Sequence, residues 1–225
     1  MPPTIAFRLV QQTSFDSGVP SGTAVIAHPV ATTGSFTISI IKGAEEVVRR
    51  RSLIVGPAPG ARAASGAVSV DLVVPAVATA DLEAPLEVAA GGWATFSASS
   101  GDGAAVRITD AQGGTEFDSR RLGAGDLFAV TLVRPGRYRV TETGSGITLD
   151  ARVTYPRPGP TPYRPADPQR VHFAAGFDPA TVELGPGQGL VVEVGEVAHM
   201  VVELIEPDDG PAPDDRARRP RWSRR

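Results

Sequence analysis

The chain has 225 residues, with 25 glycines, 21 prolines, no cysteine and a formal net charge of −3. This length, with 41% hydrophobic residues, suffices for one large domain or two small ones. The lack of cysteine excludes disulfides, thiolate metal sites and cysteine nucleophiles, and the small net charge gives the molecule as a whole no preference for a polyanionic partner.

No membrane-targeting or membrane-spanning segment is expected. Residues 1–18 hold no long apolar core, so a secretory signal peptide is not expected and the default location is cytoplasmic. No window contains enough consecutive apolar residues to span a bilayer.

Residues 1–78 are predicted to be an N-terminal β region. Apolar and polar residues alternate at 5–9, 35–41 and 68–74, and turn-forming residues separate these runs. Residues 44–51 fit either a short helix or a strand with a charged edge.

Residues 79–156 are predicted to form a central β-sandwich. Seven short apolar runs separated by turns are typical of an antiparallel sandwich of the cupredoxin-like or immunoglobulin-like kind. The prolines of 157–168 indicate an extended connector after this region.

Residues 169–206 resume the strand pattern, but they are too few to form a sandwich alone. Either they pack on the N-terminal region, which makes the central region an insertion, or they pack on another subunit. The first arrangement is preferred. The predicted fold class is all-β, with antiparallel sandwiches, followed by a disordered charged tail at 207–225.

An internal repeat joins the central and C-terminal regions. Residues 86–98 match residues 182–194 as a strand, a glycine-containing turn and an apolar strand, at a spacing of 96 residues.

The segment 123–149 resembles the closing hairpin of a blue-copper (cupredoxin) domain, because residues 135–138 read Pro-Gly-Arg-Tyr at a strand start. In that family, a cysteine, a histidine and a methionine follow as copper ligands. The resemblance places Glu142, Ser145 and Ile147 at or near those positions. Blue copper needs a thiolate and two imidazoles, so these residues indicate the frame of the fold without its chemistry.

The C-terminal region resembles the opening half of the same family. Phe177-Asp178-Pro179 precedes a strand and the turn Pro186-Gly187, and His199 falls near the place of the first copper histidine. A thiolate-free metal site at His172, His199 and Met200 is the alternative to purely structural histidines. Because His199 and Met200 are adjacent on a strand, their side chains are expected to point to opposite faces.

No catalytic constellation or cofactor is predicted. Glu142 is either a buried general acid or base with a raised pKa, or an exposed loop residue, and the second is preferred. Asp126 is expected to cap a turn. Trp93 is expected to be a core anchor, with an exposed ligand-stacking role as the alternative.

The tail is the one segment with a signal for an anionic partner. It contains an aromatic residue among arginines, namely Arg216, Arg218, Arg219, Arg221, Trp222, Arg224 and Arg225. Such a segment either binds nucleic acid or an anionic surface, or simply keeps the protein soluble.

The leading functional hypothesis is a non-catalytic structural or protein-interaction module, an accessory subunit of a larger assembly, with a protein partner or self-association. The alternatives are a copper-binding or electron-transfer protein and a module that binds carbohydrate or another small ligand.

Overall fold

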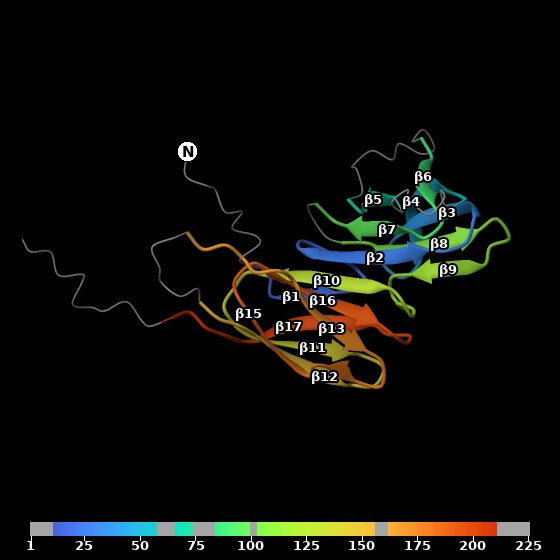
Figure 1. Cartoon of the computed structure of the whole chain (residues 1–225). Helices are drawn as coiled ribbons and strands as arrows, with labels where there is room; N and C mark the ends of the chain where they lie inside the picture. The colour runs from blue at the N-terminus through green and yellow to red at the C-terminus, as the bar shows by residue number, and fades with distance from the viewer. Residues whose placement is uncertain (1–10, 58–65, 74–83, 100–102, 156–161, 211–225) are drawn as a thin grey trace, which may run out of the picture.

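The computed structural model describes residues 11–57, 66–73, 84–99, 103–155 and 162–210. The elements in this part of the chain are all β-strands, and they form three mixed sheets, none closed into a barrel (Figure 1). The predicted all-β class is confirmed at this level. The strand expected at 5–9 and the tail arginines lie outside the described residues.

Seventeen strands are described. They are β1 (Ser14–Asp16), β2 (Ala24–Val30), β3 (Gly34–Lys42), β4 (Glu46–Gly56), β5 (Ala67–Asp71), β6 (Leu86–Ala89), β7 (Gly92–Ser97), β8 (Ala105–Asp110), β9 (Thr115–Asp118), β10 (Leu127–Leu132), β11 (Gly136–Glu142), β12 (Thr148–Val153), β13 (Gln169–Phe173), β14 (Phe177–Asp178), β15 (Thr181–Leu184), β16 (Gln188–Val194) and β17 (Met200–Pro207).

We name the sheets by their place along the chain. The N-terminal sheet has the strand order β6-β4-β3-β8-β9, and the C-terminal sheet has the order β1-β17-β11-β12-β15. The central sheet has the order β14-β13-β16-β10-β2-β7-β5. In the view of Figure 1, its strands β2, β10 and β16 lie between the other two sheets.

The core lies on one face of the central sheet. Buried and part-exposed residues alternate along its two middle strands, as expected of strands with one solvated face. The antiparallel register of β10 and β2 turns the buried side chains of both strands to the same face. These buried residues are Ala24, Ile26, Val30, Phe128, Val130 and Leu132.

The chain folds into two units with the same strand topology. Each unit contains a hairpin, β3–β4 in the first and β11–β12 in the second. A parallel strand, β6 or β15, pairs with the second strand of this hairpin. The strand that follows, β7 or β16, then joins the central sheet. A glycine with positive φ opens the equivalent strands β3 and β11, Gly34 at 152° and Gly136 at 146°. The repeat predicted from 86–98 and 182–194 is therefore confirmed, and it extends through the rest of both units.

The two units exchange their first strands. β1 precedes β2 of the N-terminal unit, yet it pairs with β17 in the C-terminal sheet. β9 precedes β10 of the C-terminal unit, yet it pairs with β8 in the N-terminal sheet. Each unit therefore completes its outer sheet with a strand that leads into the other unit.

The exchanged strands share the sequence Phe-Asp-Ser, at 15–17 and 117–119. The Ser17 amide donates to the Met200 carbonyl at 2.9 Å, and the Met200 amide donates to Ser17 Oγ at 3.0 Å. Ser119 and Val106 make the same two bonds, also at 2.9 and 3.0 Å. Both serines are fully buried, so these bonds satisfy backbone groups that water cannot reach.

An approximate twofold axis relates the two units. Ile26 and Phe128 each lie 11 residues after the phenylalanine of their own motif, and they are directly opposite each other in the β10–β2 pair. The flanking pairs, Leu127 with Ala27 and Ala129 with Val25, exchange places under this axis. The central sheet is thus continuous across the unit boundary.

Residues 46–56 form the strand β4, which confirms the strand alternative for 44–51, although β4 lies inside its sheet, between β6 and β3. One expectation needs correction. The region 79–156 does not form a sandwich of its own, because β6 to β9 pair within the N-terminal unit or its sheet and β10 to β12 belong with the C-terminal strands. Strand pairing over long sequence separations, which alternation alone does not encode, causes this division.

The two serines test the exchange directly. We expect Ser17→Ala and Ser119→Ala each to lower the free energy of unfolding by about 2 kcal/mol, because each leaves a buried amide without its acceptor. Ser119→Ala should lower the free energy of unfolding more than Ser17→Ala, since Ser119 Oγ also donates to the Gly18 carbonyl at 3.0 Å. Urea unfolding measures both, with the exposed Ser35→Ala on β3 as the control. Losses no larger than that of the control would contradict this account.

Candidate functional site

Three residues singled out by the copper-family resemblance lie together. Glu142 ends β11, Ser145 follows in the turn, and His199 immediately precedes β17. The β11–β17 pairing, in which Glu142 is opposite Met200, brings these distant segments side by side. The His199 amide donates to Glu142 Oε1 at 3.3 Å.

Glu142 organises the turn that follows it. Its carboxylate accepts hydrogen bonds from the Gly144 amide at 2.9 Å, the Ser145 amide at 2.6 Å and Ser145 Oγ at 2.8 Å. Burial opposes ionisation of this carboxyl, but the hydrogen bonds outweigh it and lower the pKa of Glu142 to about 2. Both sequence interpretations are corrected: Glu142 is buried, and its pKa is shifted in the direction opposite to that of a general acid.

The residues of this cluster do not fit a blue-copper centre. Both oxygens of Glu142 are occupied by the turn, and Ser145 and Ile147 offer no thiolate or imidazole. His172 is on β13 in the central sheet, whereas His199 borders the C-terminal sheet. Met200 is fully buried while His199 is half-buried, as alternation predicts. Over the described residues, no three His, Asp or Glu side chains are placed to hold a metal ion.

His199 instead binds the exchanged strand. Its Nε2 lies 2.6 Å from Asp16 Oδ1, and Asp16 Oδ1 also accepts the Gly18 amide at 2.6 Å. The hydrogen bond to Asp16 raises the pKa of His199, and it outweighs burial. Burial opposes ionisation of Asp16, but the bonds from His199 and Gly18 lower its pKa. Sequence reasoning missed Asp16, which only the repeated Phe-Asp-Ser motif singles out.

The equivalent carboxylate in the other unit has different partners. Asp118 Oδ2 lies 3.1 Å from Arg107 Nε and 2.8 Å from an Arg120 guanidinium nitrogen, and its Oδ1 accepts the Arg120 amide at 3.0 Å. The guanidinium groups stay charged at every ordinary pH, whereas His199 titrates. The two exchanged strands are thus held by a permanent ion pair in one unit and a titratable one in the other.

A second histidine, His28, is part-buried at the boundary between the units. His28 Nδ1 on β2 lies 2.7 Å from Oδ1 of Asp126, which is 2% exposed, and the Gly123 amide donates to Asp126 Oδ2 at 2.6 Å. The predicted turn-capping role of Asp126 is confirmed. The His28 ring also contacts Phe117, with centroids 4.7 Å apart. This cluster fixes the start of β10 against β2.

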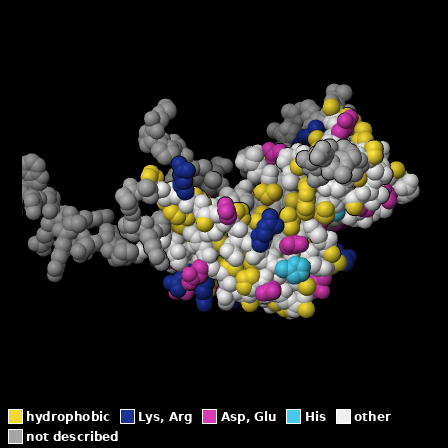
Figure 2. All heavy atoms as spheres, viewed as in Figure 1, with side chains coloured by type: hydrophobic (Ala, Val, Ile, Leu, Met, Phe, Trp, Pro, Cys, Tyr) yellow, Lys and Arg dark blue, Asp and Glu magenta, His cyan; other side chains and the backbone are white. Residues whose placement is uncertain are grey.

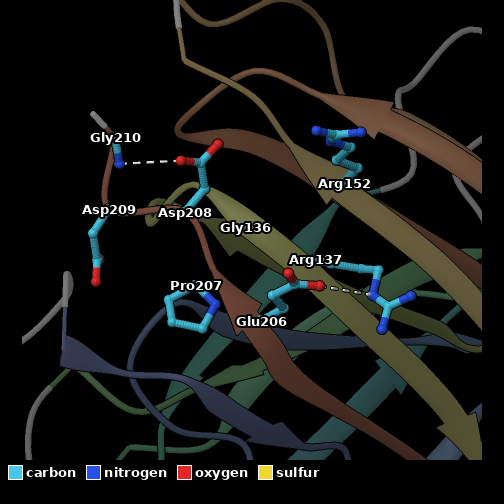
Figure 3. Close-up of a pocket in the computed structure, with 8 residues that line it drawn as sticks. All are labelled: Gly136, Arg137, Arg152, Glu206, Pro207, Asp208, Asp209 and Gly210. Atoms are coloured by element: carbon cyan, nitrogen blue, oxygen red, sulfur yellow. Dashed lines mark hydrogen bonds and ion pairs between the residues drawn. The ribbon is translucent and has the colours of Figure 1, made fainter. Parts of the chain in front are cut away.

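An open groove lies where β11 and β17 meet (Figure 3), and Arg137 and Glu206 lie side by side in it with Nε and Oε2 3.9 Å apart. Asp209 pairs with Arg134 at 2.8 Å, and Asp208 Oδ1 accepts the Gly210 amide at 3.0 Å. Because these exposed charges compensate one another, the groove presents no concentrated charge to a ligand.

The outer face of the central sheet carries a set of part-exposed apolar residues. Its outward residues are part-exposed and lie in rows across the strands, because the registers place Val25 beside Ala129 and Ala129 beside Val191. We call this surface the central face; its apolar residues are Val25, Ala27, Pro29, Trp93, Leu127, Ala129 and Val191. Figure 2 shows hydrophobic side chains gathered over β2 and β10.

Trp93 belongs to this face and not to the core. Ala94 and Phe96 are fully buried, so alternation along β7 turns Trp93 outward, where it lies between Pro29 and Ala67 of the neighbouring strands. The expected core anchor is therefore corrected to a part-exposed aromatic residue. Within the described residues no helix is long and apolar enough to cross a membrane.

Replacing Glu142 tests its role as an ionised turn-forming residue. We expect Glu142→Gln to lower the free energy of unfolding by about 2 kcal/mol at neutral pH. The pKa of Glu142 in the folded protein lies below its ordinary value of 4.5. The contribution of the ionised carboxylate to the free energy of unfolding is therefore complete above pH 4.5 and is lost as the pH falls towards 2. Urea unfolding at neutral and acid pH measures it, with the exposed Glu183→Gln as the control. A variant as stable as the control would overturn the assignment.

The two strand contacts should differ in pH dependence. Asp16→Asn keeps the bond from Gly18 but loses the ion pair, so we expect it to reduce stability by about 0.5 kcal/mol at about pH 5.5. The contribution of His199 to the free energy of unfolding is complete below pH 6.5 and is lost as the pH rises through its raised pKa. The contribution of Asp16 is complete above pH 3.8 and is lost as the pH falls through its lowered pKa. The effect should therefore shrink at about pH 8.5.

Asp118→Asn is the matched control, since the arginines beside Asp118 do not titrate in this range. Its effect on the free energy of unfolding should be the same at both pH values. Parallel pH behaviour of the two variants would refute the distinction.

Comparisons with models of protein families, with curated proteins and with solved structures find no match. The likeness of 123–149 and 177–199 to blue-copper proteins therefore remains a prediction from the sequence. Function is argued below from the geometry of the described residues.

Proposed function

We propose that this protein is a non-catalytic protein-interaction module that binds its partner on the central face. The observation that carries the proposal is the continuous apolar surface that the central sheet presents across both units. Its middle row runs Ser97, Val25, Ala129 and Val191, with Arg170 at one end. Apolar residues at the centre with polar residues at the rim are the usual anatomy of a protein interface.

The framework beneath this face favours a docking role. The β10–β2 pair, the exchanged strands and the part-buried His28–Asp126 contact all join the two units, so the face is held as one surface. A preorganised surface loses little conformational entropy on binding, which is what a binding scaffold needs.

A second candidate is favoured by one residue. Trp93 lies beside Pro29 on the same face, and a part-exposed tryptophan can stack on a sugar or another planar ligand. This supports the small-ligand alternative. The electron-transfer alternative has less support, because Glu142 uses its carboxylate to form the turn.

Substitution of an outward residue tests the proposal. We expect Leu127→Gln to change the free energy of unfolding by no more than about 0.5 kcal/mol, because its side chain faces away from the core. It should abolish capture of the partner by immobilised protein from a lysate of the source organism.

Ile54→Gln is the matched control, because Ile54 is 40% exposed on β4 of the N-terminal sheet, away from the central face. The proposal requires a protein that wild type and this control both retain and that Leu127→Gln loses. Equal retention by all three chains would place the binding surface elsewhere. If Trp93→Ala abolishes sugar binding but leaves protein capture unchanged, the result favours the second candidate, a small-ligand module.

A further inference from the structure

We propose that the partner on the central face is a second copy of this chain, packed face to face with the first. The inference rests on the proposed function and names the partner for the same surface. It differs from the exchange of β1 and β9, which occurs within one chain.

The approximate symmetry of the face suits a second copy. The axis between Ile26 and Phe128 makes the halves of the face similar, with Val25 and Ala27 on one side and Ala129 and Leu127 on the other. In a twofold dimer the same patch meets itself, so facing residues must be complementary in size. A twofold axis along the strands sets β2 of one copy over β10 of the other, so that Val25 faces Ala129 and Leu127 faces Ala27, a larger residue against a smaller one each time.

The size of the face is adequate for such a dimer. The central sheet has seven strands, which at about 4.8 Å spacing and about 20 Å length outline about 600 Å² in each copy. Two copies bury about 1,200 Å² in total, the lower end of what stable specific interfaces use. Sheets pack face to face at about 10 Å, with interdigitating small and branched residues of the kind found here. The expected Kd is in about the micromolar range.

The charges at the rim select one orientation. Arg170 lies at the β13 end of the middle row, beside Val191, and Asp71 lies at the β5 end, beside Ser97. The Asp71 carboxylate is fixed by the Val73 amide at 3.0 Å. The axis along the strands brings Arg170 of each copy over the Asp71 end of the other and sets Glu193, exposed in the next row, over Thr95. An in-plane axis along the middle row would instead set Arg170 over Arg170 and Asp71 over Asp71. Electrostatic complementarity therefore favours the first.

Sedimentation equilibrium of the purified full chain over a concentration series tests the inference. We expect wild type to approach twice the chain mass of 23.4 kDa at about micromolar concentration and above. Ala129→Arg, at the centre of the face, should remain monomeric, and Arg170→Glu should weaken the dimer about tenfold. Urea unfolding shows that both variants keep their fold, and Ile54→Arg on the N-terminal sheet is the control that should still dimerise.

A wild-type chain that stays monomeric at about 100 μM overturns the inference. That result would not contradict the proposed function, which the lysate capture tests separately. Failure of the dimer and failure of the binding surface are therefore distinguishable. A dimer that survives Ala129→Arg also overturns it, because association would then use another face. An unchanged Kd for Arg170→Glu refutes the orientation.

Discussion

The reciprocal exchange of two Phe-Asp-Ser strands is the constraint on which the rest of the structure depends. Each outer sheet is completed by a strand that continues into the opposite unit, so neither unit is finished by its own stretch of sequence. Phe15 and Phe117 enter the core, and Ser17 and Ser119 satisfy buried amides beside them. Together with the β10–β2 pair, these crossings join the two units, so that the central sheet runs from one unit into the other.

The two units share one backbone arrangement but differ in the side chains at equivalent positions. Opposite Met200 in the C-terminal sheet is Glu142, whereas opposite the equivalent Val106 in the N-terminal sheet is Ile40. Asp16 binds a histidine and Asp118 binds arginines, although both carboxylates follow the same phenylalanine. The crossing beside β17 therefore has a carboxylate and a histidine, whereas the crossing beside β8 has Ile40 in place of that carboxylate and arginines around Asp118. The asymmetry concerns how firmly each strand is held, and it leaves the fold unchanged.

Local sequence patterns predicted most strands. In stretches such as 35–41 and 68–74, apolar residues alternate with polar ones because one face of the strand is buried and the other is not. The repeat at 86–98 and 182–194 was also visible, since both segments keep a turn between two strands. The exchange was not predictable from alternation, because the partner of Ser14 is Glu203, far along the chain. The same limit applied to the site. The resemblance singled out Glu142 and His199 in two separate segments, but their proximity and the role of Asp16 depend on strand pairings that no local signal encodes.

The pairing of β1 with β17 also sets an order of events during synthesis. The N-terminal unit has every strand of its sheet once β9 has been made, whereas β1 is made early and must wait for β17, near the end of the described chain. Contacts between such distant segments form late because their loop-closure entropy is large. During synthesis β1 is thus made before the other described strands but pairs only after β17 has been made, and this pairing completes the C-terminal sheet.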